Sequence, residues 1–372
     1  MKTWETDVKP PWENVEVTTK NGIITPVDSK PLAVWACDVE DEPLSWLWYP
    51  YLLHRNINTI GGEAGTGKTQ FICGLGAAVT TKQPDGMPGI IEKHGTFLYL
   101  GGEDGNSVMR SRLEAAGADL SKCALVEKPI DCMGNEFIEL IKQVKPALIV
   151  FDPLLSYVGA DININSYIDA RRVIDYLREV AREHDTCIVL IIHPPKNSNY
   201  KLFYRFTGSG AFVDGVRTAT YIGYHPTELN KRVGIQVKTN NKHAAPFVFS
   251  NDEELGFIWE GDDPTIRSKD VEAITAFETT GSMCSNFEYY EKVIIELMKV
   301  NPTGITATAK GILDKYSKIR SHDINPKSFG QALNKVTLQR ALLKNDIVLK
   351  KAANTHNRQS YNLYYKEAIM DI

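Results

Sequence analysis

Apolar and polar positions along the chain predict strands and helices that alternate over residues 31–260. Continuous apolar runs predict buried strands at 96–100, 147–151 and 187–192. An amphipathic helix is predicted over 168–184, with Val173, Leu177, Val180 and Ala181 on one face. Further strands are predicted at 57–60, 125–128, 218–224, 232–239, 246–250 and 256–259, and helices at 70–80, 107–116 and 136–144. Such alternation predicts an α/β fold with a mostly parallel sheet and the later strands at its edge.

The pattern changes after residue 260. Residues 261–285 lose the strand pattern and are predicted to be a linker. Helices are then predicted at 287–300, 305–316 and 327–344, followed by two strands at 347–350 and 360–365. Three helices and a β-hairpin are the order of a winged helix, and a small interaction domain is the alternative. The predicted parts are therefore a flexible arm at 1–30, the α/β domain at 31–260, the linker at 261–285 and a winged-helix-like α+β domain at 286–372.

Composition limits the class of protein. The 372 residues predict two or three domains, and 43% hydrophobic with 24% charged residues is typical of a soluble globular protein. The longest apolar runs are far shorter than a bilayer requires, and the N-terminus has no apolar core after its charge, so we expect neither membrane segment nor secretory signal. Six cysteines without CxxC spacing predict reduced thiols rather than disulfides or a zinc site. We therefore expect a cytoplasmic protein.

Charge is distributed unevenly. Residues 286–372 hold 14 Lys and Arg against 8 Asp and Glu, a net charge of +6, whereas the remainder holds 28 against 38, a net charge of −10. A basic tail of this modest size favours a nucleic-acid contact only slightly over a solvated surface.

The strongest motif is GEAGTGKT at 62–69, a complete GxxxxGK[ST]. Its glycines let the backbone N–H groups surround phosphate oxygens at a helix N-terminus, Lys68 reaches the β- and γ-phosphates, and Thr69 binds Mg²⁺. An apolar strand before the motif and a helix after it disfavour an incidental glycine-rich turn. The motif predicts ATP and Mg²⁺ as cofactors, bound through Gly62, Glu63, Ala64, Gly65, Thr66, Gly67, Lys68, Thr69 and Gln70.

Polar residues at the ends of three predicted strands complete this site. Asp152 follows 147–151 and is the candidate for the second Mg²⁺ ligand, with a strand-end cap as the alternative. Glu103 and Asp104 follow 96–100, and Glu103 is the better candidate for the catalytic base, although two exposed acids opening a helix are the alternative. His193 follows 187–192, where it can reach the γ-phosphate. Strand ends of a parallel sheet share one edge, which predicts that these residues lie near the P-loop.

The chain resembles the RecA-like hexameric ATPases, in the branch that contains the plasmid replicative helicase RepA. The resemblance covers about 31–260 and follows family order through 38–48, 62–69, 98–104, 112–119, 148–153, 192–194, 208–217 and 256–259. One departure is the proline after Asp152, where family members often have a threonine or a similar polar residue.

The resemblance implies roles for individual residues. Glu103 is similar to the catalytic glutamate, Asp152 to the magnesium aspartate and His193 to the phosphate sensor. Arg112 matches the arginine that stacks on adenine, and Arg217 matches an arginine finger that acts from the next subunit. Arg205 and Arg232 are rivals for the finger, and Lys238 could assist it. A finger that acts in trans implies a homo-oligomer, expected to be a hexameric ring.

DNA contacts are predicted in two places. The loop at 194–206 has three cations, no acid and four aromatics, and its candidate residues for single-stranded DNA are Lys196, Tyr200, Lys201, Tyr204 and Arg205; a mobile solvated loop is the alternative. In the C-terminal region, the candidates are Lys327, Lys335, Arg340, Lys344, Lys350, Lys351, His356 and Arg358, while Phe329, Leu333, Val336 and Leu342 are expected in the core.

Together these features predict an Mg-ATP-hydrolysing helicase of a plasmid, phage or other mobile element, working with other replication proteins. Two alternatives remain open: a recombination ATPase that forms filaments, and an ATP-switched DNA-binding or helicase-loader protein with slow turnover. The set of Glu103, Asp152 and Arg217 argues against the switch, which does not need a base and a finger.

Overall fold

The chain divides into two units, Met1–Leu44 and Ser45–Ile372, in a computed structural model. The model describes residues 17–20, 23–26, 35–39, 43–102, 105–159, 162–163, 166–193, 211–241, 243–252, 256–280, 285–320, 324–355 and 358–366. The first unit contains the antiparallel pair β1 (Val17–Lys20) and β2 (Ile23–Pro26) and the short helix η1 (Ala36–Asp38). A hairpin therefore lies within the range that was predicted to be a flexible arm.

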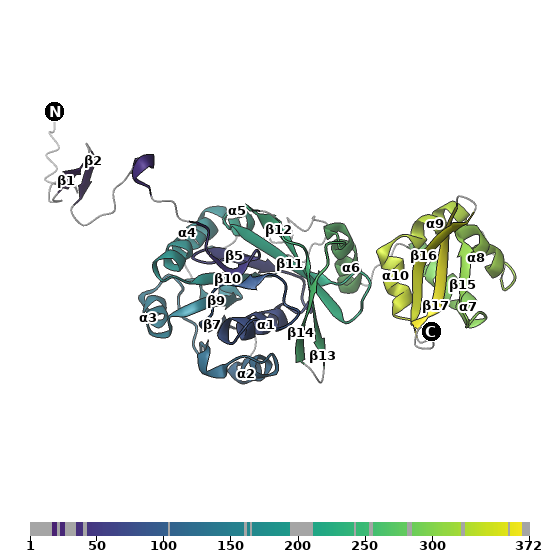
Figure 1. Ribbon diagram of the computed structural model, residues 1–372, viewed down its shortest axis with the longest axis horizontal. Coiled ribbons are helices and arrows are strands. Elements are labelled where there is room, and N and C mark those ends of the chain that lie inside the picture. The colour runs from purple at the N-terminus through teal and green to yellow at the C-terminus, as the bar shows by residue number, and fades with distance from the viewer. Residues whose placement is uncertain are drawn as a thin grey trace, which may run out of the picture. The chain divides into compact units, whose positions relative to one another are not determined.

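A nine-stranded sheet forms the centre of the second unit (Figure 1). Its spatial order is β14 (Gly256–Asp262), β13 (Phe247–Asp252), β12 (Lys231–Thr239), β11 (Thr218–Tyr224), β5 (Ile57–Gly61), β10 (Cys187–Ile192), β9 (Pro146–Asp152), β7 (Thr96–Gly101) and β8 (Cys123–Leu125). All neighbours from β8 to β11 are parallel, whereas β11 to β14 pair antiparallel. The predicted α/β fold with a mostly parallel sheet is confirmed.

Helices cover both faces of this sheet. Helices α1 (Lys68–Thr80) and α2 (Asn106–Ala115) pack on one face, and α3 (Asn135–Val144), α4 (Tyr167–Glu183) and α5 (Ala211–Asp214) pack on the other. The side chains of β9 alternate between the two faces of the sheet. Leu148 and Val150 pack on the α1 side, and Ile149 and Phe151 pack on the α4 side. Burial on both faces explains why the sequence shows continuous apolar runs here rather than alternation.

Smaller elements complete the α1 side. A three-stranded sheet of β4 (Leu52–Leu53), β3 (Trp46–Tyr49) and β6 (Ile90–Ile91) packs beside α1. Its fully buried Trp48 lies among Tyr51, Phe247 and Trp259, with ring centroids 4.1 to 5.4 Å away. Two short 3-10 helices, η2 (Leu120–Lys122) and η3 (Leu154–Tyr157), lie between the larger elements.

The range 261–285, predicted to be a linker, contains helix α6 (Ser268–Thr280). Its side chains Val271, Ile274 and Thr275 are fully buried, and α6 packs on β11. Val271 and Thr275 reach the backbone of Gly223, where a larger residue would displace them. The sequence did not predict this helix, because only a narrow stripe of its surface is apolar and the hydrophobic pattern is therefore weak.

The C-terminal part has a hydrophobic core of its own. It contains α7 (Ser285–Lys299), β15 (Ile305–Thr308), α8 (Ala309–Tyr316), α9 (Pro326–Leu333), α10 (Val336–Leu343), β16 (Ile347–Thr355) and β17 (Arg358–Tyr365), with the antiparallel sheet order β15-β17-β16. Of the side chains expected in the core, Phe329, Leu333 and Leu342 are fully buried and Val336 is half-buried.

Two helix predictions in this part were wrong. The segment predicted as a helix at 305–316 begins with β15, whose Thr308 then caps α8 by accepting a hydrogen bond from the Gly311 N–H. The helix predicted at 327–344 breaks between α9 and α10. Lys335 has extended dihedrals at the break, and the Asn334 side chain donates to the Gly330 carbonyl, 2.8 Å away, which ends α9.

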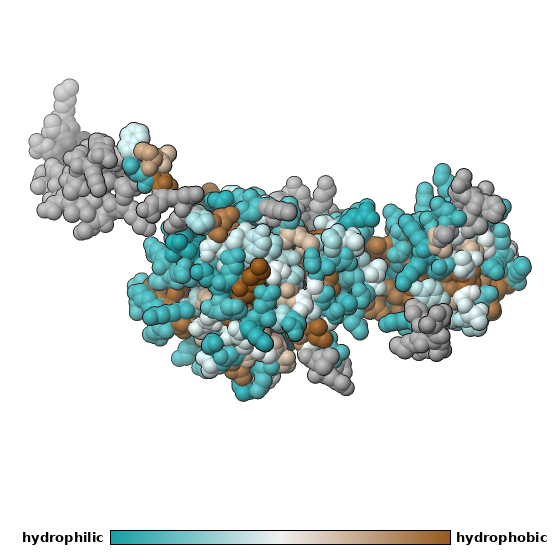
Figure 2. Space-filling view, in the orientation of Figure 1, coloured by the Kyte–Doolittle hydropathy of each residue, from teal (hydrophilic) through white to brown (hydrophobic). Residues whose placement is uncertain are grey.

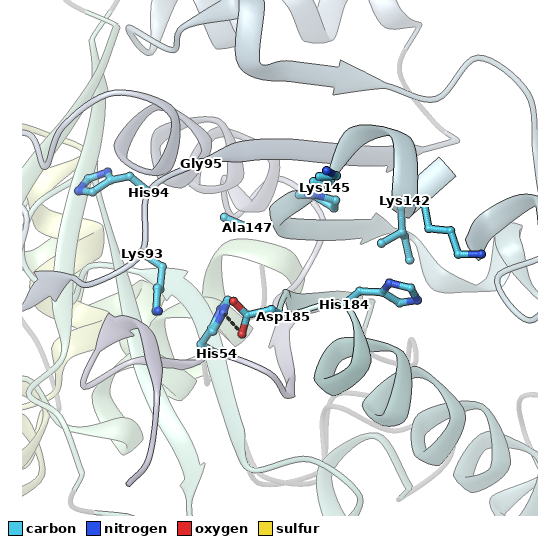
Figure 3. A pocket seen from close by; sticks show the side chains of 11 residues that line it. His54, Lys93, His94, Gly95, Lys142, Lys145, Ala147, His184 and Asp185 are labelled. Atoms are coloured by element: carbon cyan, nitrogen blue, oxygen red, sulfur yellow. Dashed lines mark ion pairs between the residues drawn. The ribbon is translucent and has the colours of Figure 1, made fainter. Parts of the chain in front are cut away.

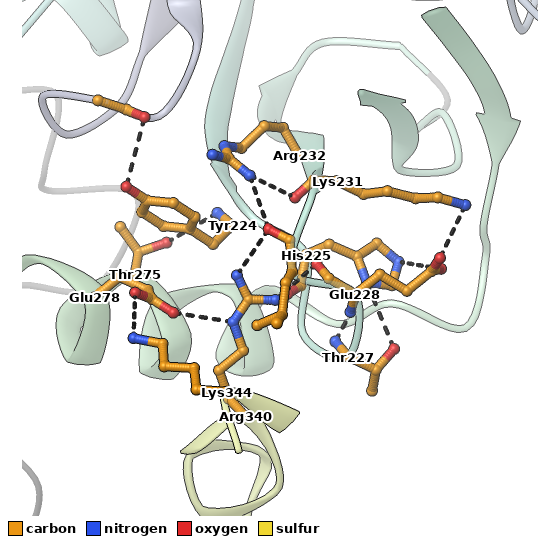
Figure 4. A network of polar contacts seen from close by, with 12 residues as sticks. Tyr224, His225, Thr227, Glu228, Lys231, Arg232, Thr275, Glu278, Arg340 and Lys344 are labelled. Carbon is orange, nitrogen blue, oxygen red and sulfur yellow. Dashed lines mark hydrogen bonds and ion pairs between the residues drawn. The ribbon is translucent and has the colours of Figure 1, made fainter. Parts of the chain in front are cut away.

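Arg340 on α10 was predicted to contact DNA, and the structure contradicts this prediction. Its side chain is 2% exposed and pairs with Glu278 of α6 at 2.9 Å. The same guanidinium donates to the carbonyl oxygens of His225, Glu228 and Leu229 in the turn between β11 and β12 (Figure 4). Arg340 therefore ties the C-terminal part to the sheet and has no surface left for a nucleic acid.

The described cysteines Cys37, Cys73, Cys123, Cys132 and Cys187 are all free thiols, and Cys73, Cys132 and Cys187 are buried. Among the helices in the described ranges, none has the length and apolar character needed to cross a membrane.

Candidate nucleotide-binding site

The GxxxxGK[ST] motif forms the turn between β5 and α1. Gly65 and Gly67 have φ values of +77° and +86°, which side chains at these positions would strain. At Gly62 a Cβ atom would lie 2.5 Å from the Ile222 carbonyl oxygen of the neighbouring strand β11. The loop can therefore follow this path only with glycine at these positions, and Gly67 directly precedes the first turn of α1.

Lys68 is held inside the loop. Its side-chain amine donates to the carbonyl oxygens of Gly62 at 2.7 Å and Glu63 at 2.9 Å, and the residue is 6% exposed. The loop is further closed by Thr66, whose hydroxyl donates to the Glu63 carbonyl at 2.8 Å. The α1 N-terminus and the Lys68 charge thus both favour an anion at the mouth of the loop.

Asp152 and His193 reach the same edge of the sheet from two parallel strands. Asp152 is the last residue of β9 and is 6% exposed, and its Oδ2 accepts a hydrogen bond from the Tyr99 hydroxyl at 3.0 Å. The Tyr99 bond fixes the carboxylate orientation. His193 directly follows β10, which lies between β5 and β9, and it is exposed.

One cavity of about 310 Å³ brings most of these residues together. It is lined by Ala64, Gly65, Gly67, Lys68, Thr69, Gln70, Arg112, Asp152 and His193. Gly62, Glu63 and Thr66 do not line this cavity; they take part in the hydrogen bonds within the loop. A second cavity of about 490 Å³ shares Gln70 and Arg112 with the first and continues between α2 and the β13–β14 hairpin, past Val108, Ala115 and Phe257.

Magnesium fits the first cavity. Thr69 and Asp152 both line it and offer a hydroxyl and a carboxylate. In the described part of the chain, no group of three or more His, Cys, Asp and Glu side chains forms a ready metal site. Mg²⁺ at ATP sites usually takes one or two protein ligands and completes its shell with phosphate oxygens and water, so two such ligands are sufficient.

Tyr224 and Arg232 lie beside the phosphate loop. The sequence analysis named Arg232 only as a rival for the finger and did not single out Tyr224. The Tyr224 hydroxyl donates to the Gly65 carbonyl at 3.5 Å, and the Arg232 guanidinium lies 4.5 Å from the Tyr224 ring centroid. Arg232 also donates to the Leu229 and Lys231 carbonyls, and burial lowers its pKa from the usual range. The signal for Tyr224 was available, since it ends the strand next to β5 at the carboxyl edge.

Arg217 does not join the phosphate loop of its own chain. It is exposed and precedes Thr218, the first residue of β11, whereas the loop follows Gly61, which pairs with Tyr221 farther along that strand. Lys238 lies opposite Ala219 near the same end, and its amine donates to the carbonyls of Val213 and Asp214 at 2.6 and 2.9 Å. Burial lowers the pKa of Lys238.

Several predicted residues lie outside the described part of the chain. These are Glu103 and Asp104, the DNA-binding candidates Lys196, Tyr200, Lys201, Tyr204 and Arg205, and His356.

A phosphate loop between a central parallel strand and its helix, with a carboxylate at the end of a nearby strand, defines a P-loop ATPase with a RecA-like core. A family model described as an AAA domain matches residues 25–199. No curated protein matches the chain significantly.

Among solved structures, the chain is similar to a KaiC-like protein from the hyperthermophilic archaeon Pyrococcus horikoshii OT3. The two share 16% identity with a TM-score of 0.41, over 57% of this chain and 93% of the other. The assignment of the class rests on the strand order and the phosphate loop described above.

Proposed function

We propose that the protein is a DNA-stimulated Mg-ATPase motor, and specifically a hexameric replicative helicase. The cavity that joins Lys68, Thr69, Asp152 and His193 carries the ATPase part of this proposal. The resemblance of residues 31–260 to the RepA branch supports the helicase part.

The residues of the cavity divide the work on ATP between them. The loop N–H groups and Lys68 bind the β- and γ-phosphates. Arg112 and the second cavity hold the adenine ring. Thr69 and Asp152 hold Mg²⁺, which neutralises phosphate charge when bound. Glu103 orients the attacking water and accepts its proton, while His193 contacts the γ-phosphate.

The position of Arg217 supports catalysis between subunits. It lies at the start of β11, the end of the strand away from its own phosphate loop. An arginine finger must reach the γ-phosphoryl oxygens, so Arg217 can serve only the site of another subunit. Arg232 lies near the loop of its own chain and is the alternative for a finger in cis.

The C-terminal part is proposed to be a winged-helix-like DNA or protein contact. Its sheet order β15-β17-β16 and its sequence of a helix, a strand, three helices and a hairpin support this reading. The cations Lys327, Lys335, Lys350 and Lys351 are exposed and available, in contrast to Arg340.

The test is the steady-state ATPase rate with and without single-stranded DNA, with Glu103→Gln as the inactive reference. We expect the DNA to raise the rate severalfold and the variant to lose at least about a hundredfold, as is usual when a catalytic base is removed. A slow rate that DNA does not change would contradict the motor and favour the ATP-switched loader.

A recombination ATPase would use the same site, so the assembly distinguishes it from a helicase. Electron microscopy with ATP and DNA should show closed rings for the helicase and open filaments for the recombination enzyme. Strand-displacement activity on a forked duplex should accompany the rings.

A further inference from the structure

A third cavity lies at the end of the sheet away from the phosphate loop. It measures about 510 Å³ and lies where the chain enters four neighbouring parallel strands: His54 precedes β5, Gly95 precedes β7, Lys145 precedes β9 and Asp185 precedes β10. The ATP site occupies the opposite ends of these strands. The proposed ATPase therefore leaves this cavity without a role.

Positive charge dominates the lining. Lys93 reaches the cavity from the segment before β7, and Lys142 and Lys145 reach it from the end of α3 (Figure 3). Asp185 is the one acid among the described residues that line the cavity. Lys142 pairs with Glu139 at 2.8 Å, whereas Lys93 and Lys145 have no acidic partner within the described ranges. Three lysines held around one hollow repel one another unless an anion lies between them.

His54 adds a buried group that lacks a hydrogen bond. Its side chain is 2% exposed, and neither ring nitrogen has a hydrogen-bond partner among the residues that the structure describes. The Nε2 atom lies 3.3 Å from Oδ1 of Asp185, close enough for an ion pair with a protonated ring but without the alignment of a hydrogen bond. Buried polar atoms are almost always satisfied by a protein group, a water or an ion, so this ring favours a polar ligand atom or a water at the base of the cavity.

We propose that this cavity binds a phosphate-bearing ligand through Lys93 and Lys145, with His54 at its base. Lysine ammonium groups bind phosphate oxygens as point charges, and Lys93 and Lys145 supply two such charges at this cavity. The Asp185 carboxylate does not oppose this, because it faces the His54 ring and also lies 3.8 Å from the Arg55 guanidinium. The phosphate could come from a small molecule such as a polyphosphate, or from the backbone of single-stranded nucleic acid.

The test uses pyrophosphate and the full chain with Lys68→Ala, which removes the phosphate loop as a competing site. Isothermal titration calorimetry should show binding, and the ring resonances of His54 should shift in the NMR spectrum. Combining Lys93→Ala with Lys145→Asn in this background should weaken binding at least about tenfold, since a charge-assisted hydrogen bond contributes roughly that factor. Asparagine suits position 145 because the residue has a φ of +48°.

Lys318→Ala is the matched control, because Lys318 is an exposed lysine of the C-terminal part outside the cavity. The control should leave the affinity for pyrophosphate unchanged, and circular dichroism should show that each variant is folded. If the double change unfolds the chain, Lys93→Gln alone replaces it in the binding test. An oligonucleotide that competes with pyrophosphate identifies nucleic acid as the source of the phosphate, and the lack of competition identifies a small molecule. The absence of binding in the Lys68→Ala chain, an unshifted His54, or equal affinity in the cavity variants would overturn the proposal. The ATPase could fail its own test without affecting these results.

Discussion

At the scale of single residues, the phosphate loop depends on positions that have no side chain. Gly62 approaches the Ile222 carbonyl of the neighbouring strand, and Gly65 and Gly67 adopt left-handed dihedrals. The consequence is a tight loop whose Gly62 and Glu63 carbonyls hold the Lys68 amine. The charge that recognises phosphate is thus positioned by backbone geometry.

His225 is a second residue whose local surroundings determine its chemistry. Its Nδ1 accepts hydrogen bonds from the N–H groups of Thr227 and Glu228, which requires an unprotonated nitrogen (Figure 4). Burial is the largest cause that lowers the pKa of His225; Lys231 and Arg340 lower it as well, whereas Glu228 and Asp263 raise it.

This lowered pKa predicts a loss of stability in acid. The histidine of the unfolded chain binds a proton near pH 6.5, whereas that of the folded chain binds one only at lower pH. The contribution of neutral His225 to the free energy of unfolding is therefore complete above pH 6.5 and falls as the pH drops. Below pH 6.5 the free energy of unfolding should decrease by up to about 1.4 kcal/mol per pH unit for this group. Urea unfolding measured between pH 5 and pH 7.5 tests this.

His225→Asn is the informative variant, because its side-chain oxygen can still accept the two N–H groups but does not titrate. The pH dependence should become flatter, although the burial of His54 leaves a residual slope of the same sign. The exposed His94, changed to Asn, is the control. An unchanged slope in His225→Asn would show that the turn is not the sensitive element.

At the scale of elements, the buried parallel strands were predictable and the segments around them were not. Strand β10 has the bounds expected from its apolar run, because burial on both faces leaves a continuous signal. Helix α6 and strand β15 were missed, since the partner surface of each is distant in sequence. The break between α9 and α10 depends on a side-chain bond of Asn334 that propensity does not show.

Arg340 gives the element-scale prediction. Arg340→Met removes the ion pair with Glu278 and the donor to three carbonyls of the β11–β12 turn, of which, among the described residues, only that of Leu229 keeps a second donor, Arg232. Breaking a buried pair in this way typically costs about 3–5 kcal/mol, so the urea midpoint should fall substantially and protease should cleave near α6.

The control for this prediction is Lys335→Met on the exposed cap of α10, which should change stability by less than about 0.5 kcal/mol. Equal midpoints for the two variants would mean that Arg340 does not hold the C-terminal part on the sheet. Lys344 also pairs with Glu278, at 2.9 Å, and its removal should have a smaller effect because its side chain is 45% exposed.

At the scale of the whole molecule, the two ends of the sheet carry different chemistry. The carboxyl ends of β5, β9 and β10 hold the ATP site, whereas the amino ends hold the lysine-lined cavity and, at β11, Arg217. A residue at the amino end can contribute to ATP hydrolysis only if subunits bring opposite ends together.

Mixing two inactive variants tests this arrangement. Lys68→Ala and Arg217→Ala are each expected to lose at least about a hundredfold in ATPase rate, since each removes a group that stabilises charge in the transition state. Mixed subunits should regain activity at interfaces that combine an intact Lys68 with an intact Arg217, and recovery should be greatest near equal amounts.

The control for mixing is Lys68→Ala combined with the double variant Lys68→Ala/Arg217→Ala, which offers no intact loop and should stay inactive. If activity does not return at any ratio, the finger acts in cis and Arg232 becomes the candidate.

The sequence by itself determined the class of protein and the identity of the phosphate loop, because a local motif and buried strands depend mainly on neighbouring residues. It also predicted that Asp152 and His193 share one edge, which follows from parallel strand ends. Only the tertiary structure decided that Arg340 is buried, that Tyr224 and Arg232 flank the loop, and that lysines distant in sequence surround one cavity. These features are contacts between segments far apart in the chain, and such contacts leave no periodic pattern in the sequence.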